Sequence, residues 1–450
     1  MIAPRPLLYH YSIVERGLNS WANEQNYYSV KKVYDFLDVP DNVGVLTRMG
    51  EHFVAARDVE QTIDFLDSHF NRSEAKWVNK LYYPYDYDLW EKAHDDDRKE
   101  ASDIHPLVLK EDYGSLSAFH QDREKIRANL RWILGEEPPG VRSINVGSWD
   151  PPKEDWITRI IPRPEVPGAK SIYLGPYTAI GEHIGGVLYC PVDENGTIKL
   201  PPGGKLPVVI YSHQYAYSTG FSKGYDKDGR NGNADLFKEL VGKGFAVMAI
   251  DMFGFGTRIE EATNFYQRHP KWSKMGKMIR DVMGCIDAVE DLDYLDNEQV
   301  YLLGNTIGGS VSLMTAALDP RVAGVATVAA FSPWRTSNHQ YESLKTYSHL
   351  HGFIPRLGFF AENPQGVPLD FGEIIAAAAP KPLLIIAPDL DRYTNIPDLK
   401  NAMRPVSNIY KLYGNEDQFI VTYPHEINRM TREMYKEVAD FFLDLVKTTT

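Results

Sequence analysis

The sequence has few cysteines, no long apolar run and no excess of positive charge, and each absence excludes a class of protein. Of 450 residues only Cys190 and Cys285 are cysteine. Two are too few for a disulfide framework, and their spacing fits no metal site, so we expect two buried thiols. A membrane-spanning helix needs about 18 consecutive apolar residues, and no apolar run in the sequence approaches that length. The formal net charge of −13 argues against a nucleic-acid partner, and no basic amphipathic stretch indicates a membrane surface.

The N-terminal stretch also lacks the pattern of a targeting segment. Residues 1–6 (MIAPRP) contain no charged region followed by an apolar one, so we expect no signal peptide in the chain as given. The localisation stays open. It is cytoplasmic if Met1 is the true start, and periplasmic or secreted if the chain is part of a longer precursor.

What the sequence does contain is an internal repeat. Residues 3–8 (APRPLL) recur as residues 379–384 (APKPLL), an offset of 379 − 3 = 376. The same offset runs without a gap as far as residues 64–65, which match 440–441 (both Asp-Phe). Chance does not keep one register over such a length, so we treat the two segments as copies. Each copy predicts a buried strand, an acidic residue just after it, a helix, a second strand, a turn and a closing helix.

The region from about residue 170 onward alternates between apolar strands and helical segments. Predicted strands cover residues 186–189, 206–211 and 246–250, and a helix is predicted over residues 275–292. Near-continuous apolar strands that alternate with helices indicate a mostly parallel sheet covered on both faces. In such sheets, sites lie at the carboxyl ends of the strands.

Residues 300–309 (VYLLGNTIGG) have the layout of a strand, a glycine-flanked turn and a helix. They match G-x-S-x-G, the nucleophile elbow, except that Thr306 takes the place of serine. A threonine hydroxyl can attack a carbonyl, but its β-branch restricts the side chain and brings a methyl group close to the bound acyl group. Ile307 follows at the start of the helix, where its backbone N–H is a candidate oxyanion-hole donor.

A second candidate donor group follows the strand over residues 206–211. The stretch Ser212-His213-Gln214-Tyr215 lies where an oxyanion-hole loop is expected, with Tyr215 and Gln214 as the donor candidates. His213 has two interpretations, a catalytic base or a residue that holds this loop by hydrogen bonds, and we favour the second.

The candidate acid and base come from the C-terminal copy. Asp389 and Asp391 both follow the strand near residue 385, and we favour Asp391 because the repeat pairs it with Glu15. The alternative for Asp391 is a surface pair or turn former. In the N-terminal copy His52 stands where a catalytic histidine is expected, but 52 + 376 = 428 is Asn. His425 is three residues earlier and is our candidate base, with a structural role as the alternative.

Together these motifs resemble the α/β-hydrolase superfamily, and within it the bacterial acetylxylan-esterase and glucuronoyl-esterase-like group. The resemblance rests on residues 2–8, 134–139 (LGEEPP), 251–256 (DMFGFG), 354–360 (IPRLGFF) and the turn at Gly304. It implies an α/β fold and a triad that cleaves acyl or uronoyl esters on plant cell-wall sugars without a cofactor or metal. Carried over to this chain, it places Thr306 as nucleophile, His425 as base and Asp391 as acid.

The repeat and the resemblance predict three segments. Residues 1–72 would be the C-terminal remnant of a first hydrolase domain, with His52 and Glu15 at its partial site. Residues 73–165 would be a helical or irregular connector. Residues 166–450 would be a complete α/β-hydrolase domain with a cap over about 332–372, in which Trp334, His339 and Tyr341 either contact a sugar or, for the tryptophan, pack in the core.

Two functional hypotheses follow. The chain is a carboxylic ester hydrolase that uses Thr306 on a small-molecule or carbohydrate ester. Alternatively it is a catalytically inactive subunit that partners an active esterase chain completed by residues 1–72, as a hetero- or homo-oligomer. Other chemistry on the same scaffold is a third possibility, because a fold does not fix a reaction.

Overall fold

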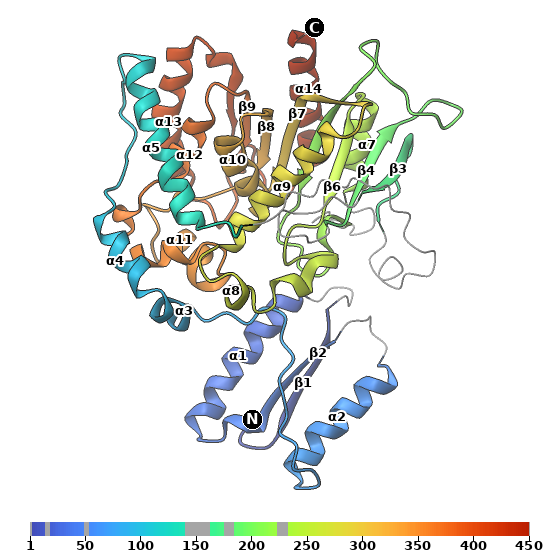
Figure 1. Ribbon diagram of the computed structural model, residues 1–450, viewed down its shortest axis with the longest axis vertical. Coiled ribbons are helices and arrows are strands. Elements are labelled where there is room, and N and C mark those ends of the chain that lie inside the picture. The colour runs from blue at the N-terminus through green and yellow to red at the C-terminus, as the bar shows by residue number, and fades with distance from the viewer. Residues whose placement is uncertain are drawn as a thin grey trace.

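The computed structural model describes residues 2–13, 19–48, 54–139, 163–174, 184–222 and 233–449. Its main body is an eight-stranded sheet with helices on both faces, and a smaller lobe built from the N-terminal residues projects from one end (Figure 1). The strands of the sheet are β3 (Ala169–Leu174), β4 (Gly186–Pro191), β5 (Leu206–Ser212), β6 (Ala246–Ile250), β7 (Leu295–Asn305), β8 (Val322–Val328), β9 (Leu383–Ile386) and β10 (Phe419–Thr422).

The spatial order of these strands is β10-β9-β8-β7-β5-β6-β4-β3. From β6 through β5, β7, β8 and β9 to β10 every pair is parallel, whereas β4 runs antiparallel to both β6 and β3. The sheet is therefore mostly parallel, as the apolar strands predicted.

Successive residues of each central strand face opposite layers of helices, as the two-residue period of a strand requires. In β5, Val208 and Ile210 belong to one apolar core and Val209 and Tyr211 to the other. The first layer contains α5 (Leu116–Leu134), α9 (Lys274–Glu290), α10 (Ile307–Leu318), α12 (Phe371–Ala378) and α13 (Ile396–Tyr413). The second contains α7 (Ala234–Gly242) and α14 (Arg432–Thr449).

Shorter helical elements connect the strands and the longer helices. They are α3 (Tyr87–Ala93), α4 (Asp95–Asp103), α8 (Phe265–Arg268), α11 (Ser343–Lys345), the π-helical turn η4 (Thr346–Leu350) and the 3-10 turns η2 (Gly220–Ser222), η3 (Gly256–Ala262), η5 (Pro355–Phe360), η6 (Pro364–Gly366) and η7 (Glu416–Gln418). Cys190 and Cys285 are buried free thiols, as predicted. Among the residues that the structure describes, no helix is long and apolar enough to span a membrane.

The N-terminal lobe repeats the element order of the C-terminal end of the main body. It contains β1 (Leu7–Ser12), α1 (Ser20–Phe36), η1 (Pro40–Asn42), β2 (Val43–Arg48) and α2 (Ala56–His69). Adding 376 to the first residues of α1, η1, β2 and α2 gives 396, 416, 419 and 432, where α13, η7, β10 and α14 begin. We call residues 2–13, 19–48 and 54–72 the N-terminal module.

Local contacts of the two copies match as well. Asn19 caps α1 by accepting the N–H of Ala22, and Asn395 caps α13 by accepting the N–H of Asp398. The Tyr34 hydroxyl donates to the Arg5 carbonyl, and the Tyr410 hydroxyl donates to the Lys381 carbonyl. All of these pairs differ by 376.

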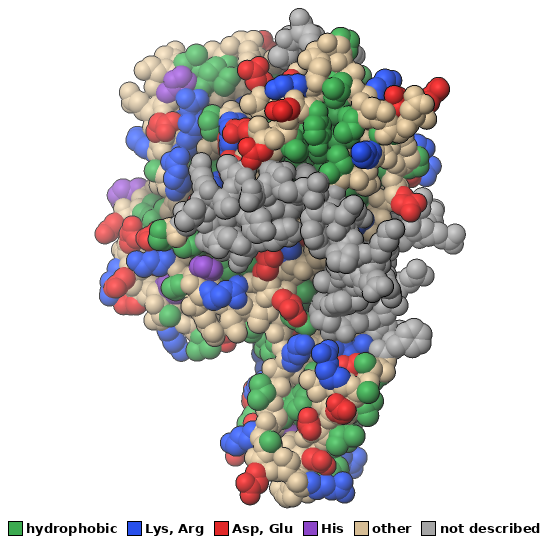
Figure 2. All heavy atoms as spheres, turned by 45° about the vertical axis from the view of Figure 1, so that its right-hand side comes forward, with side chains coloured by type: hydrophobic (Ala, Val, Ile, Leu, Met, Phe, Trp, Pro, Cys, Tyr) green, Lys and Arg blue, Asp and Glu red, His purple; other side chains and the backbone are tan. Residues whose placement is uncertain are grey.

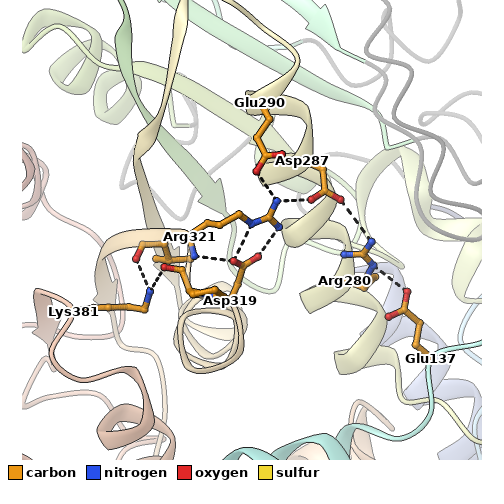
Figure 3. Close-up of polar contacts among 9 residues, drawn as sticks. Glu137, Arg280, Asp287, Glu290, Asp319, Arg321 and Lys381 are labelled. Carbon is orange, nitrogen blue, oxygen red and sulfur yellow. Dashed lines mark hydrogen bonds and ion pairs between the residues drawn. The ribbon is translucent and has the colours of Figure 1, made fainter.

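A network of charged side chains holds the amino-terminal side of the main body together (Figure 3). Arg321 donates to both carboxylate oxygens of Asp319, at 3.0 and 2.7 Å, and to Asp287 at 2.7 Å and Glu290 at 3.0 Å. Asp287 also pairs with Arg280 at 3.6 Å. Since Asp319 and Asp287 are buried, the guanidinium compensates charges that would otherwise be costly to bury.

Candidate active site

The turn between β7 and α10 places Thr306 at the carboxyl edge of the sheet. Its backbone has φ 48° and ψ −116°, a strained conformation for a β-branched residue. The Thr306 N–H donates to the carbonyl of Val328 at 2.9 Å, which ties the turn to the next strand. Its hydroxyl oxygen is buried and makes no hydrogen bond to any described residue. The turn therefore combines a strained backbone with a hydroxyl that has no hydrogen-bond partner among the described residues.

Close packing around this turn explains its glycines. A Cβ atom added at Gly308 would lie 2.1 Å from the carbonyl oxygen of Ser212, and one at Gly304 would lie 2.2 Å from the carbonyl oxygen of Gly308. Neither distance is sterically possible, so both positions require glycine. The contact with Ser212 also brings the start of α10 against the loop that follows β5.

That loop contains the other candidate oxyanion-hole residues. Gln214 is buried, and its side-chain oxygen accepts a hydrogen bond from the Tyr211 hydroxyl at 3.3 Å. The Tyr215 ring packs against the His351 ring, with centroids 5.1 Å apart. Because Ile307 begins α10 at the same edge of the sheet, its backbone N–H and those of this loop belong to neighbouring segments.

His213 is buried between two backbone groups. Its Nδ1 is 2.7 Å from the carbonyl of Gln214, and its Nε2 accepts the N–H of Met252 at 3.0 Å. Burial lowers the pKa of its imidazole, which keeps it neutral and able to accept. Both ring nitrogens are thus used to join the loops after β5 and β6, in agreement with the structural role that we favoured.

Asp251, at the start of the DMFGFG stretch, also has a structural role. Its carboxylate accepts hydrogen bonds from the N–H of Phe221 at 3.0 Å and from the N–H and hydroxyl of Thr257 at 2.9 and 2.7 Å, and it pairs with Arg163 at 3.2 Å. Burial alone would raise the pKa of this carboxyl, but the positive charge of Arg163 and these hydrogen bonds hold it low. The ionised carboxylate anchors three loops.

The candidate acid and base follow β9 and β10, but their pairing differs from the one expected. The Nδ1 of His425 is 3.0 Å from Oδ1 and 3.2 Å from Oδ2 of Asp389, and no hydrogen bond joins it to Asp391 among the described residues. The Asp391 carboxylate instead accepts the N–H of Tyr393 at 3.0 Å and the hydroxyl of Thr394 at 2.9 Å. The expected Asp391–His425 pair is therefore corrected, because the turn after β9 directs Asp391 into its own loop.

His425 lies at the surface and is not hydrogen-bonded to Thr306. Its side chain is 78% exposed, and no hydrogen bond joins it to Thr306 among the described residues. Proton transfer between the two needs the His425 ring to approach the Thr306 hydroxyl. His52 and Glu15, the candidates of the N-terminal copy, lie outside the described residues.

Two known protein groups match this chain in sequence. A family model described as "Serine aminopeptidase, S33" matches residues 229–366. A Bacillus subtilis (strain 168) protein named as a hydrolase, YtaP, is 24% identical over 224 residues, which is 48% of this chain and 71% of that protein.

Among solved structures, a glucuronoyl esterase from Solibacter usitatus has a TM-score of 0.56 at 12% identity and covers 74% of this chain and 94% of that one. A CE15 glucuronoyl esterase from Caldicellulosiruptor kristjansonii has a TM-score of 0.57 at 16% identity, over 76% and 91%. This chain has the α/β-hydrolase fold. The family model and the Bacillus subtilis relative, which match in sequence, are both hydrolases, and these sequence matches support hydrolase chemistry.

In this fold, the cap candidates separate into core and surface. Trp334 is fully buried, and its ring packs on Phe371 and Tyr347 with centroids 4.7 and 5.5 Å away. It belongs to the core. His339 is exposed and Tyr341 partly so.

The sequence gives Asp389 as the second candidate for the acid, after Asp391. The structure favours Asp389 because its carboxylate, and not that of Asp391, contacts His425. No group of three or more His, Cys, Asp or Glu side chains among the described residues is arranged to hold a metal ion.

Proposed function

We propose that this α/β-hydrolase is a carboxylic ester hydrolase that acts on acylated or uronoyl-ester carbohydrate, with Thr306 as its nucleophile. The observation that carries the proposal is the unpaired Thr306 hydroxyl at the strained turn between β7 and α10. Strain of this kind persists where a side chain must be presented to a substrate. The substrate class is supported by the glucuronoyl esterases to which the fold is similar.

The base and the orienting acid are His425 and Asp389. The Asp389 carboxylate on Nδ1 of His425 holds the tautomer whose Nε2 accepts a proton, and it stabilises the imidazolium that forms. Thr306 Oγ1 attacks the ester carbonyl as its proton passes to His425. The alcohol then leaves with that proton, and water releases the acid from Thr306 in a second round.

The backbone N–H of Ile307 and that of Tyr215 are the proposed oxyanion donors. Ile307 is the first residue of α10, where the helix dipole favours the negative charge that develops on the carbonyl oxygen. Tyr215 belongs to the loop after β5, in which the backbone of Ser212 and His213 contacts Gly308. Gln214 positions this loop through its bond with Tyr211.

Hydrolysis of p-nitrophenyl acetate by the wild type and by Thr306→Ala tests the proposal. Removal of the nucleophile should lower kcat/KM by roughly 100-fold or more. Thr197→Ala, at an exposed threonine of a surface turn, is the matched control and should keep full activity. Equal rates for Thr306→Ala and the wild type would exclude Thr306 as the nucleophile.

A second candidate function, a subunit that completes a hydrolase domain with another chain, is favoured by the surface of the N-terminal module. Four apolar side chains of α2 and its C-terminal cap are exposed along one helical face, namely Val59, Ile63, Leu66 and Phe70. Their counterparts in α14 at offset 376 face the main body, where Tyr435, Ala439 and Phe442 are buried. Phe442 packs on Tyr301 of β7 and on Phe245.

The sheet of the N-terminal module is incomplete in the corresponding way. β1 pairs only with β2 among the described strands, whereas its counterpart β9 also pairs with β8. An open strand edge beside an exposed apolar helix face is the surface that the front half of a hydrolase domain would cover. We infer that the occupant is a separate chain that carries such a half.

The test uses tagged full-length chain purified from the cells that produce it. Light scattering should give a mass above the monomer, and mass spectrometry of the complex should identify a chain with strands equivalent to β3 to β8. Ile63→Lys with Leu66→Lys should release it, while Val78→Lys, at an exposed apolar residue outside the face, should not. A monomer, a homodimer or retention by the double variant contradicts the inference.

A further inference from the structure

The junction between the N-terminal module and the main body encloses a cavity that lies apart from Thr306. It opens to solvent, and the space between its walls, the open mouth included, is about 530 Å³. Trp21 and Gln25 of α1 form one side, and Tyr85, Phe255 and Lys274 lie among the other lining residues. None of Thr306, Asp389, Asp391 and His425 lines it. In Figure 1 the upper end of α1 meets the main body beside α8.

Hydrogen bonds hold the walls of this cavity in place. Ser20, the first residue of α1, bonds through its hydroxyl to that of Ser218 at 3.1 Å. The Tyr85 hydroxyl donates to the Ser348 carbonyl at 2.7 Å. The Trp21 ring stacks on Tyr217 at 5.6 Å and lies 4.4 Å from the His351 ring. The cavity is therefore a built feature of the docked module.

The cation in this cavity forms no direct ion pair among the described residues, and the charge of the buried Glu24 acts on it from a greater distance. Lys274 is 5% exposed, and its ammonium group makes no hydrogen bond or ion pair among the described residues. It lies 5.5 Å from the centre of the Tyr85 ring and 5.7 Å from that of Tyr266. Lys274 is also the first residue of α9, where the positive end of the helix dipole repels it.

Such a lysine costs stability, because a buried charge without a direct hydrogen bond or ion pair loses its hydration, and a carboxylate at longer range replaces only part of it. Two ring contacts offset part of this cost. Burial lowers the pKa of Lys274 to about 8, and the charge of Glu24 acts against that shift, so the ammonium form is the main one at neutral pH. A methionine would fill the same space without the cost. The charge therefore indicates a ligand.

We propose that this cavity binds a small organic anion, a carboxylate attached to a compact ring. Lys274 holds the carboxylate, and the ring lies between the aromatic side chains of Trp21 and Tyr85. Because α1 provides Trp21, the site exists only when the N-terminal module is docked. A bound anion affects the candidate oxyanion-hole residue Tyr215 through His351, because the His351 ring contacts both Trp21 and Tyr215.

The experiment titrates the full chain at pH 7 with sodium glucuronate and with sodium benzoate, followed by tryptophan fluorescence and calorimetry. Glucose and benzyl alcohol are the uncharged matches. At least one carboxylate should bind, and its uncharged match should bind at least tenfold more weakly. The two carboxylates distinguish a sugar ring from an aromatic one.

Four variants decide whether the binding is at this cavity. Lys274→Met, which loses a charge that makes no hydrogen bond and no direct ion pair among the described residues and should fold, is expected to weaken binding at least tenfold, and Trp21→Leu should weaken it too. Lys345→Met, at a surface lysine of the cap, and Thr306→Ala should bind as the wild type does. Binding that is absent for both carboxylates, unchanged in Lys274→Met or lost in Thr306→Ala would overturn the proposal. Circular dichroism of each variant checks its fold.

Discussion

The N-terminal module and the C-terminal end of the main body show how far a repeated sequence determines a repeated structure. Helices, strands, caps and the tyrosine-to-carbonyl bonds recur at an offset of 376. The exposure of equivalent side chains does not recur. Leu66 in α2 is 40% exposed, whereas its counterpart Phe442 in α14 is fully buried. Local sequence sets the elements, and the neighbours available for packing set which faces are covered.

The largest difference between the two copies is expected when one side chain is shortened at equivalent positions of α14 and α2. Phe442→Ala leaves a cavity between α14 and the sheet and should lower the free energy of unfolding by about 3–5 kcal/mol. Leu66→Ala removes an exposed side chain and should change it by less than about 0.5 kcal/mol. Urea unfolding followed by circular dichroism measures both. Similar losses at the two positions would mean that α2 is covered in the isolated chain.

The next contrast is Glu24 in α1 against Lys400, its counterpart in α13. Glu24 is buried and accepts the N–H groups of Tyr82 and Tyr83 at 2.7 and 2.8 Å. Glu24→Ala leaves these donors unpaired and should cost about 2–4 kcal/mol. Lys400 is exposed, and Lys400→Ala should be nearly neutral by the same denaturation assay.

The pH dependence of stability tests Glu24 further. Burial raises the pKa of its carboxyl to about 7, above the ordinary 4.5. Between these values the folded protein keeps a proton that the unfolded chain releases, so the Glu24 contribution is full below pH 4.5 and is lost as the pH rises to about 7. The wild type should lose stability relative to Glu24→Ala over this range. A constant difference between the two would show that burial does not raise this pKa.

A smaller effect separates the two carboxylates after β9. Asp389→Asn should reduce kcat of ester hydrolysis by roughly 30-fold, because His425 loses the group that orients it. Asp391→Asn, the variant at the position that the repeat pairs with Glu15, should keep kcat within about threefold while the melting temperature falls slightly. The reverse result would restore Asp391 as the acid.

The smallest effect is expected for the pair that should behave alike. Tyr34→Phe and Tyr410→Phe each remove one hydroxyl bond to a backbone carbonyl and should cost about 1 kcal/mol each. Thermal unfolding of both variants measures the losses. A clear difference between them would show that the equivalent bonds are not equivalent in energy.

Much of this could be predicted from sequence because it is local. The glycines around Thr306 and the alternation of strands and helices predicted the sheet and the sharp turn. The choice between Asp389 and Asp391 could not be predicted, because both lie on one short turn and the side-chain direction depends on Thr394 and the β10 loop. The cavity at Lys274 could not be predicted either, since its walls come from several segments spread between residues 21 and 353.

Covalent labelling of the nucleophile shows directly whether Thr306 attacks the substrate. Full-length protein is treated with a fluorophosphonate probe and digested, and the modified peptide is located by mass spectrometry. We expect an adduct on Thr306 that forms in the wild type and more slowly in His425→Ala. An active enzyme that carries its adduct on another residue, or none at all, would contradict it.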